Sequence, residues 1–280
     1  MSVTVKIKEK GLFKKKLDIE NIIFENMSYG TMDESYRLVE KEIGKYTIAY
    51  RKNNIGRGFE VQLQKGMINL RMNFPTSNDE IRFFYSYVKR ICELLHTTIF
   101  EREEEFVSVN DVNYFIELDI KTSKDALEKI KEDIETDRMN PIYLFGALNP
   151  ITIGEKEISI VGNDTEKLGK LFHELQSIDA YYAAVKVYQK QDESLFGIYV
   201  LTENVLSIFP FKPGLFMNNK LKIDKFYVSF VFDNELKGCM LYEDFMANVD
   251  ITKSYDTEHF LISLNKRVMK ELLEKYKKKL

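Results

Sequence analysis

The sequence predicts an α+β protein, built mostly from antiparallel sheets with helices packed on one face. Apolar and polar residues alternate over 59–63 and again over 68–74, around a Lys65-Gly66 turn, which is typical of a hairpin. An amphipathic helix is indicated after Ser77. The stretch 157–211 combines a second helical pattern with runs of aromatic and β-branched residues, so the core is expected to form largely around it.

Composition supports a folded chain with a well-hydrated surface. Of the 280 residues, 44% are hydrophobic and 13% aromatic, enough to fill one large core or two ordinary ones, and 30% are charged. The net charge of −3 provides no basic field that would gather nucleic acid or anionic lipid. These values exclude a wholly disordered chain.

Cysteine usage and the absence of long apolar runs point to the cytoplasm. Cys92 and Cys239 lie in apolar surroundings and are interpreted as buried thiols, without a disulfide framework or zinc-ligand spacing. The first residues lack an apolar stretch of signal-peptide length, and no stretch is long enough to span a bilayer. We therefore expect a cytoplasmic protein without a membrane partner.

The N-terminal elements follow from alternation and turn residues. Val3, Val5 and Ile7 alternate with polar residues and predict the first strand. Further strands are expected over 36–40 and 46–51, before a loop rich in Asn and Gly.

The helix after that hairpin carries a capping signal. Ser77 and Glu80 have the spacing of a capping box, in which each side chain bonds a backbone N–H at the helix start. A strand is expected at 97–100 and a solvated turn at 101–105. Residues 110–120 fit a strand or a helix, and we favour a helix. Thr122 or Ser123 is expected to cap a separate surface helix that ends before Asn140-Pro141.

The second half of the chain is predicted from similar patterns. We expect hairpins of 151–153 with 158–161 and of 226–232 with 236–242, a helix capped near Asn163, an antiparallel meander of 181–189, 196–201 and 205–211, and a C-terminal helix from Asp256 or Thr257.

An internal similarity suggests two lobes. Residues 67–100 and 157–188 both read as strand, capped start, helix and strand. The hypothesis is two similar lobes, 1–139 and 140–280, although one compact domain is also compatible with the length. The competing interpretation is chance reuse of a common supersecondary unit.

Candidate chemistry is sparse. The three histidines, His96, His173 and His259, are interpreted as residues at helix surfaces or boundaries, and no pattern indicates a metal site or a cofactor. The loop 53–58 contains two glycines, so its backbone can approach an anion that Arg57 would grip. A plain turn is the competing interpretation, because a phosphate loop would lead into a helix.

Surplus aromatic residues indicate a candidate binding surface. Phe83, Tyr85 and Tyr87 cover more than one face of their helix, and Phe216 lies in a loop near Pro213. If exposed, these residues and Arg57 form a contact site for a partner. Packing in the core is the alternative.

The stretch RGFEVQLQKGMINLRMNFPTSNDEIRFFYSYVKRICELL also carries a resemblance. Arg57-Gly58 opens its hairpin, and Pro75-Thr76-Ser77 leads into its aromatic helix. In these features the chain resembles an uncharacterised family of bacterial cytoplasmic proteins. The resemblance implies no activity, cofactor or site residue.

Two functions from different classes are compatible with these observations. The first is a non-catalytic cytoplasmic protein-interaction module, whose partner is another protein or a second copy of the chain. The second is an enzyme that uses carboxylates, with or without a divalent metal, in a cleft between the lobes. Nucleic-acid binding through Lys14–Lys16 is disfavoured by the net charge. The catalytic residues of the second function are unknown from the sequence.

Overall fold

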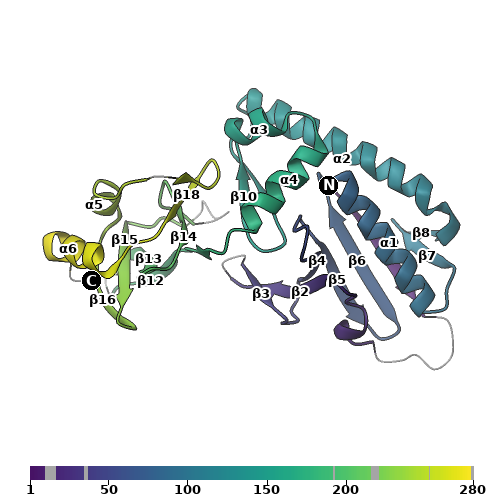
Figure 1. Cartoon of the computed structure of the whole chain (residues 1–280), viewed down its shortest axis with the longest axis horizontal. Coiled ribbons are helices and arrows are strands. Elements are labelled where there is room, and N and C mark those ends of the chain that lie inside the picture. The colour runs from purple at the N-terminus through teal and green to yellow at the C-terminus, as the bar shows by residue number, and fades with distance from the viewer. Residues whose placement is uncertain (10–16, 35–36, 192, 216–220, 252, 279–280) are drawn as a thin grey trace. The chain divides into compact units, whose positions relative to one another are not determined.

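The computed structural model describes residues 1–9, 17–34, 37–191, 193–215, 221–251 and 253–278 (Figure 1). The chain divides into two compact units, Met1–Ile178 and Asp179–Leu280. The predicted α+β class is confirmed. The sequence placed a division near residue 140, whereas the hairpin and the two helices that follow this residue belong to the first unit, which ends at Ile178.

The first unit contains an eight-stranded antiparallel sheet with the order β3-β2-β4-β5-β6-β1-β7-β8. Its strands are β1 (Ser2–Lys8), β2 (Met27–Met32), β3 (Leu38–Glu40), β4 (Thr47–Arg51), β5 (Phe59–Gln64), β6 (Met67–Asn73), β7 (Ile99–Arg102) and β8 (Glu105–Ser108). The β5–β6 hairpin and the first strand were predicted from alternation, and both are confirmed. The turn expected at 101–105 is present but shorter, because only Glu103 and Glu104 form it and the residues on either side pair as the β7–β8 hairpin.

One face of this sheet is apolar and is covered by helix α1 (Asn78–Leu94). Val3, Val5 and Ile7 of β1 are buried in the same cluster as Phe84 and Val88 of α1, while the polar residues between the strand's apolar positions lie on the other face. The alternation of apolar and polar residues along the strand therefore determines which face of the sheet the helix covers.

Helix α2 (Val112–Glu135) packs beside α1, as Figure 1 shows. The helical interpretation of 110–120 is confirmed, but the expected break near Ser123 is wrong, because one continuous helix covers both predicted segments. Ser123 does not cap it. Its buried hydroxyl accepts a hydrogen bond from the Thr76 N–H (2.8 Å) and donates to the Thr76 carbonyl (2.5 Å).

A buried polar network joins β7, α1 and α2. The Tyr85 hydroxyl donates to Asp119 (2.6 Å), while the Arg102 guanidinium donates to Tyr85 (2.9 Å) and to Asp119 (2.5 Å). Burial raises the pKa of Asp119, and the bond from Tyr85 and the charge of Arg102 oppose this shift. The carboxylate is thus buried with its partners in place.

The first unit ends with a small hairpin and two helices. Strands β9 (Ile142–Phe145) and β10 (Pro150–Ile153) pair antiparallel, followed by α3 (Glu155–Val161) and α4 (Thr165–Gln176). The predicted strand at 158–161 is wrong, because this apolar run forms α3. Asp164, rather than Asn163, is the N-cap of α4 and accepts from the Glu166 and Lys167 N–H groups.

In the second unit, the described residues form two four-stranded sheets and two helices around a shared aromatic core. The strands of the first sheet are, in spatial order, β11 (Tyr181–Tyr182), β14 (Ser207–Pro210), β18 (His259–Ile262) and β17 (Lys253–Ser254). Those of the second sheet are β12 (Lys186–Gln189), β13 (Leu195–Thr202), β15 (Lys225–Phe232) and β16 (Glu235–Leu241). The helices are α5 (Tyr242–Met246) and α6 (Lys266–Tyr276). Phe209 stacks on Tyr242 and contacts Phe245 and Phe260 at the centre.

Several predictions for this unit are corrected. The β15–β16 hairpin is confirmed. The meander is wrong beyond its first pair, because β13 pairs in parallel with β15 while β14 belongs to the other sheet. The C-terminal helix begins after Asn265 and not at Asp256. His259 is consequently a buried strand residue whose ring bonds Asp256 (2.8 Å) and Tyr182 (3.0 Å), instead of a residue in a helix's first turn.

The sequence similarity between residues 67–100 and 157–188 is not matched by the helices and strands that these residues form. Residues 67–100 run strand, helix, strand, whereas 157–188 begin with α3 and continue with α4 and two short strands. The similar-lobe hypothesis rested on a strand at 158–161 that the structure does not contain. Among the described residues, we find no helix with the length and apolarity needed to cross a bilayer.

Removing the cation from the buried network is expected to destabilise the protein strongly. Arg102→Met leaves the Asp119 carboxylate buried without its charged partner, so the free energy of unfolding should fall by about 3–5 kcal/mol. Urea denaturation followed by circular dichroism measures this change. In the control, Arg82→Met removes the exposed Arg82–Glu117 pair and should cost less than about 1 kcal/mol. Equal losses in the two variants would contradict the assignment.

Both thiols are expected to resist alkylation in the folded protein. Burial raises the pKa of Cys92 to about 12 and also raises the pKa of Cys239. At pH 8 only about one part in ten thousand of Cys92 is thiolate, the reactive form. Mass spectrometry after iodoacetamide treatment should show neither thiol modified in buffer and both modified in guanidinium. Rapid labelling of the native chain would refute the buried placement.

Candidate functional site

The loop Lys52–Gly58, between β4 and β5, is fixed by polar side chains from two helices and forms the centre of the candidate site. Ser77 begins α1 as predicted, and its hydroxyl accepts from the Glu80 N–H at 3.1 Å. The other half of the predicted capping box differs, because the Glu80 carboxylate bonds the loop.

Glu80 supplies an internal anion for this loop. Its carboxylate accepts from the Gly58 N–H (2.6 Å), the Arg57 N–H (3.2 Å) and the Thr76 hydroxyl. The residue is only 8% exposed. A Cβ at Gly56 would lie about 2.5 Å from a Glu80 oxygen, so glycine is required for this close approach. The sequence interpretation of an anion-binding backbone was therefore physically sound, but the chain's own carboxylate fills that role.

Arg57 is turned into the protein and is not offered to an external anion. Its guanidinium donates to the carbonyl oxygens of Phe145 and Pro75, both at 3.0 Å. Burial lowers the pKa of Arg57 to about 10, and the Glu80 charge opposes this shift, so the side chain stays protonated at neutral pH. The predicted grip on a ligand anion is replaced by a structural role joining the segment before α1 to β9.

Helix α4 holds the same loop from its other side. The Gln176 amide donates to the Gly56 carbonyl (2.6 Å), and its oxygen accepts from the Leu148 N–H (2.6 Å). The Ile55 N–H donates to Nδ1 of His173 (3.1 Å). His173 therefore has a loop-anchoring role, which its position on an amphipathic helix did not reveal.

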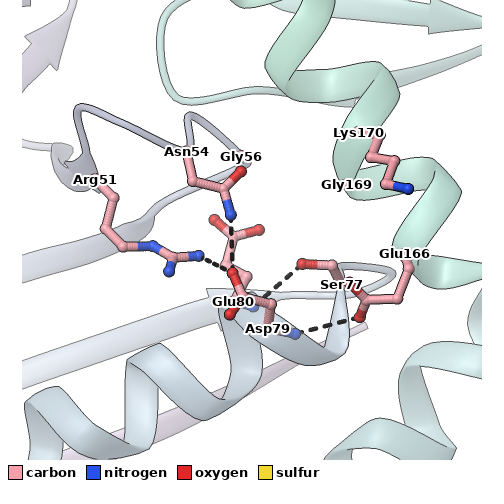
Figure 2. Close-up of a pocket in the computed structure, with 9 residues that line it drawn as sticks. All are labelled: Arg51, Asn54, Gly56, Ser77, Asp79, Glu80, Glu166, Gly169 and Lys170. Atoms are coloured by element: carbon pink, nitrogen blue, oxygen red, sulfur yellow. Dashed lines mark hydrogen bonds and ion pairs between the residues drawn. The ribbon is translucent and has the colours of Figure 1, made fainter.

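Around this loop lies an open hollow of about 310 Å³, which we call the charged hollow (Figure 2). It is lined by Arg51, Asn54, Gly56, Ser77, Asp79, Glu80, Glu166, Gly169 and Lys170. Arg51 and Asn54 reach from the loop side to the Asp79 carboxylate, Arg51 as an ion pair and Asn54 at 2.8 Å.

The opposite wall of the charged hollow comes from α4. Glu166 accepts from the Asp79 N–H at 3.3 Å, and Lys170 lies one turn further along and is exposed. Gly169 allows α4 to approach α1, because a Cβ there would lie 2.7 Å from the Ser77 Cβ. The hollow therefore presents carboxylates and ammonium or guanidinium groups together, an arrangement suited to recognising charged groups.

The predicted candidates are distributed between this site and the core. Phe83 is half-buried and lies under the Arg51 guanidinium, 4.7 Å from its carbon to the ring centroid, so it supports the charged hollow from below. Tyr85 and Tyr87 are buried, at 0% and 2% exposure, and belong to the core. Phe216 and the Lys14–Lys16 run lie outside the described residues.

Sequence reasoning missed Asp79, Glu166 and Lys170 as neighbours. Asp79 and Glu166 were visible only as acidic residues of two helix starts, where acids are common for dipole reasons alone. Their proximity depends on how α1 and α4 pack, which no local pattern encodes. Within the described ranges, no group of three or more His, Cys, Asp or Glu side chains is placed to hold a metal ion.

The chain belongs to a family known as a domain of unknown function, DUF4299, whose model matches residues 2–272. This covers nearly the whole sequence and confirms the predicted membership of an uncharacterised family. No curated protein matches the chain. No solved structure matches it either.

Replacing the internal anion is expected to loosen the loop. Glu80→Gln keeps the shape but exchanges one acceptor oxygen for a donor, which faces a backbone N–H, and it removes the charge beside Arg57. The free energy of unfolding should fall by about 1.5–3 kcal/mol, the usual range for hydrogen bonds to a charged group. Urea denaturation measures the loss, and hydrogen exchange at Gly58 should accelerate.

The matched control is Glu166→Gln, which makes the same chemical change at a less buried carboxylate of the charged hollow. We expect a loss within about 0.5 kcal/mol for this surface substitution. If the hydrogen-exchange rate of the Gly58 amide were the same in Glu80→Gln as in the wild type, the Glu80 carboxylate would not be what holds the loop.

Proposed function

We propose that this protein is a non-catalytic cytoplasmic binding module that acts through protein contacts, with the charged hollow as its contact site. The partner presents charged groups of both signs, because the hollow contains both. It is another protein or a second copy of the chain.

The observation that carries this proposal is the commitment of the Glu80 carboxylate to the protein's own donors. A general base must have an oxygen within hydrogen-bond reach of the substrate proton that it removes. Three protein donors already bond the Glu80 carboxylate, and two of them are backbone N–H groups of the loop. Removing a substrate proton would compete with the bonds that fix the site. The Glu80 carboxylate, the most buried one in the lining of the hollow, therefore suits a structural role better than a catalytic one.

The remaining charged groups suit recognition. Asp79 has a half-exposed side chain and Lys170 is exposed, so both are accessible to a partner. Arg51 is oriented by Asp79 and by the Phe83 ring, which reduces the freedom that binding would otherwise remove. A hollow with pre-oriented charges of both signs favours specificity and the rate of association.

Composition supports the location and the partner class of this proposal. Both cysteines are free and buried, as expected for a protein of a reducing compartment. The net charge of −3 disfavours nucleic acid as the partner. A protein surface with complementary charges fits these observations.

An enzyme using carboxylates is the second candidate. The specific observation in its favour is that Asp79, Glu80 and Glu166 line one hollow together with Lys170. Acid–base chemistry would then fall to Asp79 and Glu166, which are less buried than Glu80. In that case, charge reversal at Lys170 would alter the turnover of a small molecule rather than the recovery of a protein complex.

Charge reversal at Lys170 tests the proposal. Tagged wild-type protein and Lys170→Glu would be cross-linked in host-cell lysate, and the co-purified proteins quantified by mass spectrometry. Because like charges would then face the acidic part of the site on the partner, recovery of that partner should fall about tenfold. Sedimentation velocity on the same variants measures self-association.

The matched control is Lys167→Glu. Lys167 is also an exposed lysine of α4 but does not line the charged hollow. It should recover the partner as the wild type does. Equal recovery by all three proteins, with no change in sedimentation, would exclude the charged hollow as the contact site.

A further inference from the structure

A second hollow lies on the same unit, and the charged hollow does not account for it. It has a volume of about 530 Å³, within the range of roughly 300–1,000 Å³ that is common for small-molecule sites. Gly58 and Phe59 contribute to its lining, so it begins where the loop Lys52–Gly58 enters β5. We call it the aromatic hollow.

Its walls are largely apolar. Ile48 contributes from β4, Tyr46 from the residue before that strand, Met32 from β2 and Phe145 from β9. Tyr46 remains 46% exposed, so its ring is accessible to a ligand. The Tyr46 ring already has an ammonium group near its face, since Lys45 Nζ lies 5.0 Å from the ring centroid. This contact shows that a cation can approach the ring.

The polar part of the lining is acidic. Asp33, Glu34 and Glu60 line the hollow. Asp33 faces Arg37 at 3.8 Å and Glu60 faces Arg71 at 3.5 Å, with both arginine side chains more than 40% exposed. Both pairs are long and their arginines are solvated, which weakens them, so a ligand cation can compete for either carboxylate.

Among the described residues of the lining, Arg57 is the one cation, and it does not balance these acids. Arg57 donates to two carbonyl oxygens, is 8% exposed, and has its charge opposed by the buried Glu80. Its charge is therefore committed inside the protein. The aromatic hollow thus combines apolar walls with a polar lining in which carboxylates outnumber cations.

From this combination we infer that the aromatic hollow binds a small organic cation, an amine on an aromatic or aliphatic body. The ammonium group would pair with Glu34 and Glu60, while the apolar body would lie against Tyr46, Ile48 and Phe145. This site is separate from the proposed protein-contact site and does not depend on it.

Matched probes on the isotope-labelled full chain test this inference by NMR titration. The probes are 2-phenylethylamine, 2-phenylethanol and 3-phenylpropanoate, which share a ring and differ in charge. We expect the amine to shift the signals of Tyr46 and Phe145 and to bind at least about fivefold more tightly than the alcohol, with the carboxylate weakest.

Variants then assign the charge effect to the rim. Glu34→Gln and Glu60→Gln should each weaken the amine about threefold to fivefold and leave the alcohol unchanged. The control is Glu42→Gln, which removes an exposed carboxylate outside the lining and should change neither.

Three results would overturn the inference. The first is equal affinity for the amine and the alcohol, and the second is signal shifts confined to other residues. The third is no response to the amine while pentalysine shifts the Tyr46 and Phe145 signals, which would assign the hollow to a basic segment of a protein partner instead.

Discussion

The carboxylate of Glu80, bonded to the backbone of the loop Lys52–Gly58, is the interaction on which the first unit's candidate sites depend. The N–H groups of Arg57 and Gly58 are buried, and buried donors must find acceptors. A side chain on the first turn of α1 supplies them. The bond therefore fixes three things together: the entry to β5, the start of α1 and the position of the buried arginine.

Burying a carboxylate and a guanidinium near each other requires further partners, and the chain supplies them from distant segments. Arg57 donates to carbonyl oxygens of Pro75 and Phe145, and Gln176 donates to Gly56. These contacts bring β9 and α4 to a loop that precedes them by about ninety residues or more. A buried polar network of this kind specifies one arrangement because each member left unpaired would cost free energy.

The sequence predicted the parts of this unit that local patterns encode. Alternation in β1, β5 and β6 and the Ser77 cap were read correctly, because pleat and helix start depend on near neighbours. The target of Glu80 was not predictable from the cap spacing. Capping-box geometry places its carboxylate at the helix start, and only the tertiary fold brings the loop within reach. The same limit hid the approach of Asp79 to Glu166 and Lys170.

Errors in the second unit have an equally specific origin. Asp256 was read as a helix cap, and its carboxylate does accept from the Glu258 and His259 N–H groups, as a cap would. The same geometry also closes a turn, and here the chain continues as β18. The deciding contact is long-range, the pairing of β18 with β14, and the buried His259 then bonds Tyr182 across these sheet elements. The local hydrogen bonds of Asp256 were predicted correctly, but the pairing of β18 with β14 determines that the chain continues as a strand.

The two hollows share the loop Lys52–Gly58, and this sharing constrains how they can work. Gly56 lines the charged hollow and Gly58 the aromatic hollow. Coupling between two sites needs an element with two arrangements that each ligand favours differently. The loop is held at once by Glu80, by Gln176 and through the Arg57 side chain, and moving it would leave several buried polar groups unpaired. The physical consequence is pre-organisation, because the same buried bonds hold in place the wall that the loop contributes to each hollow.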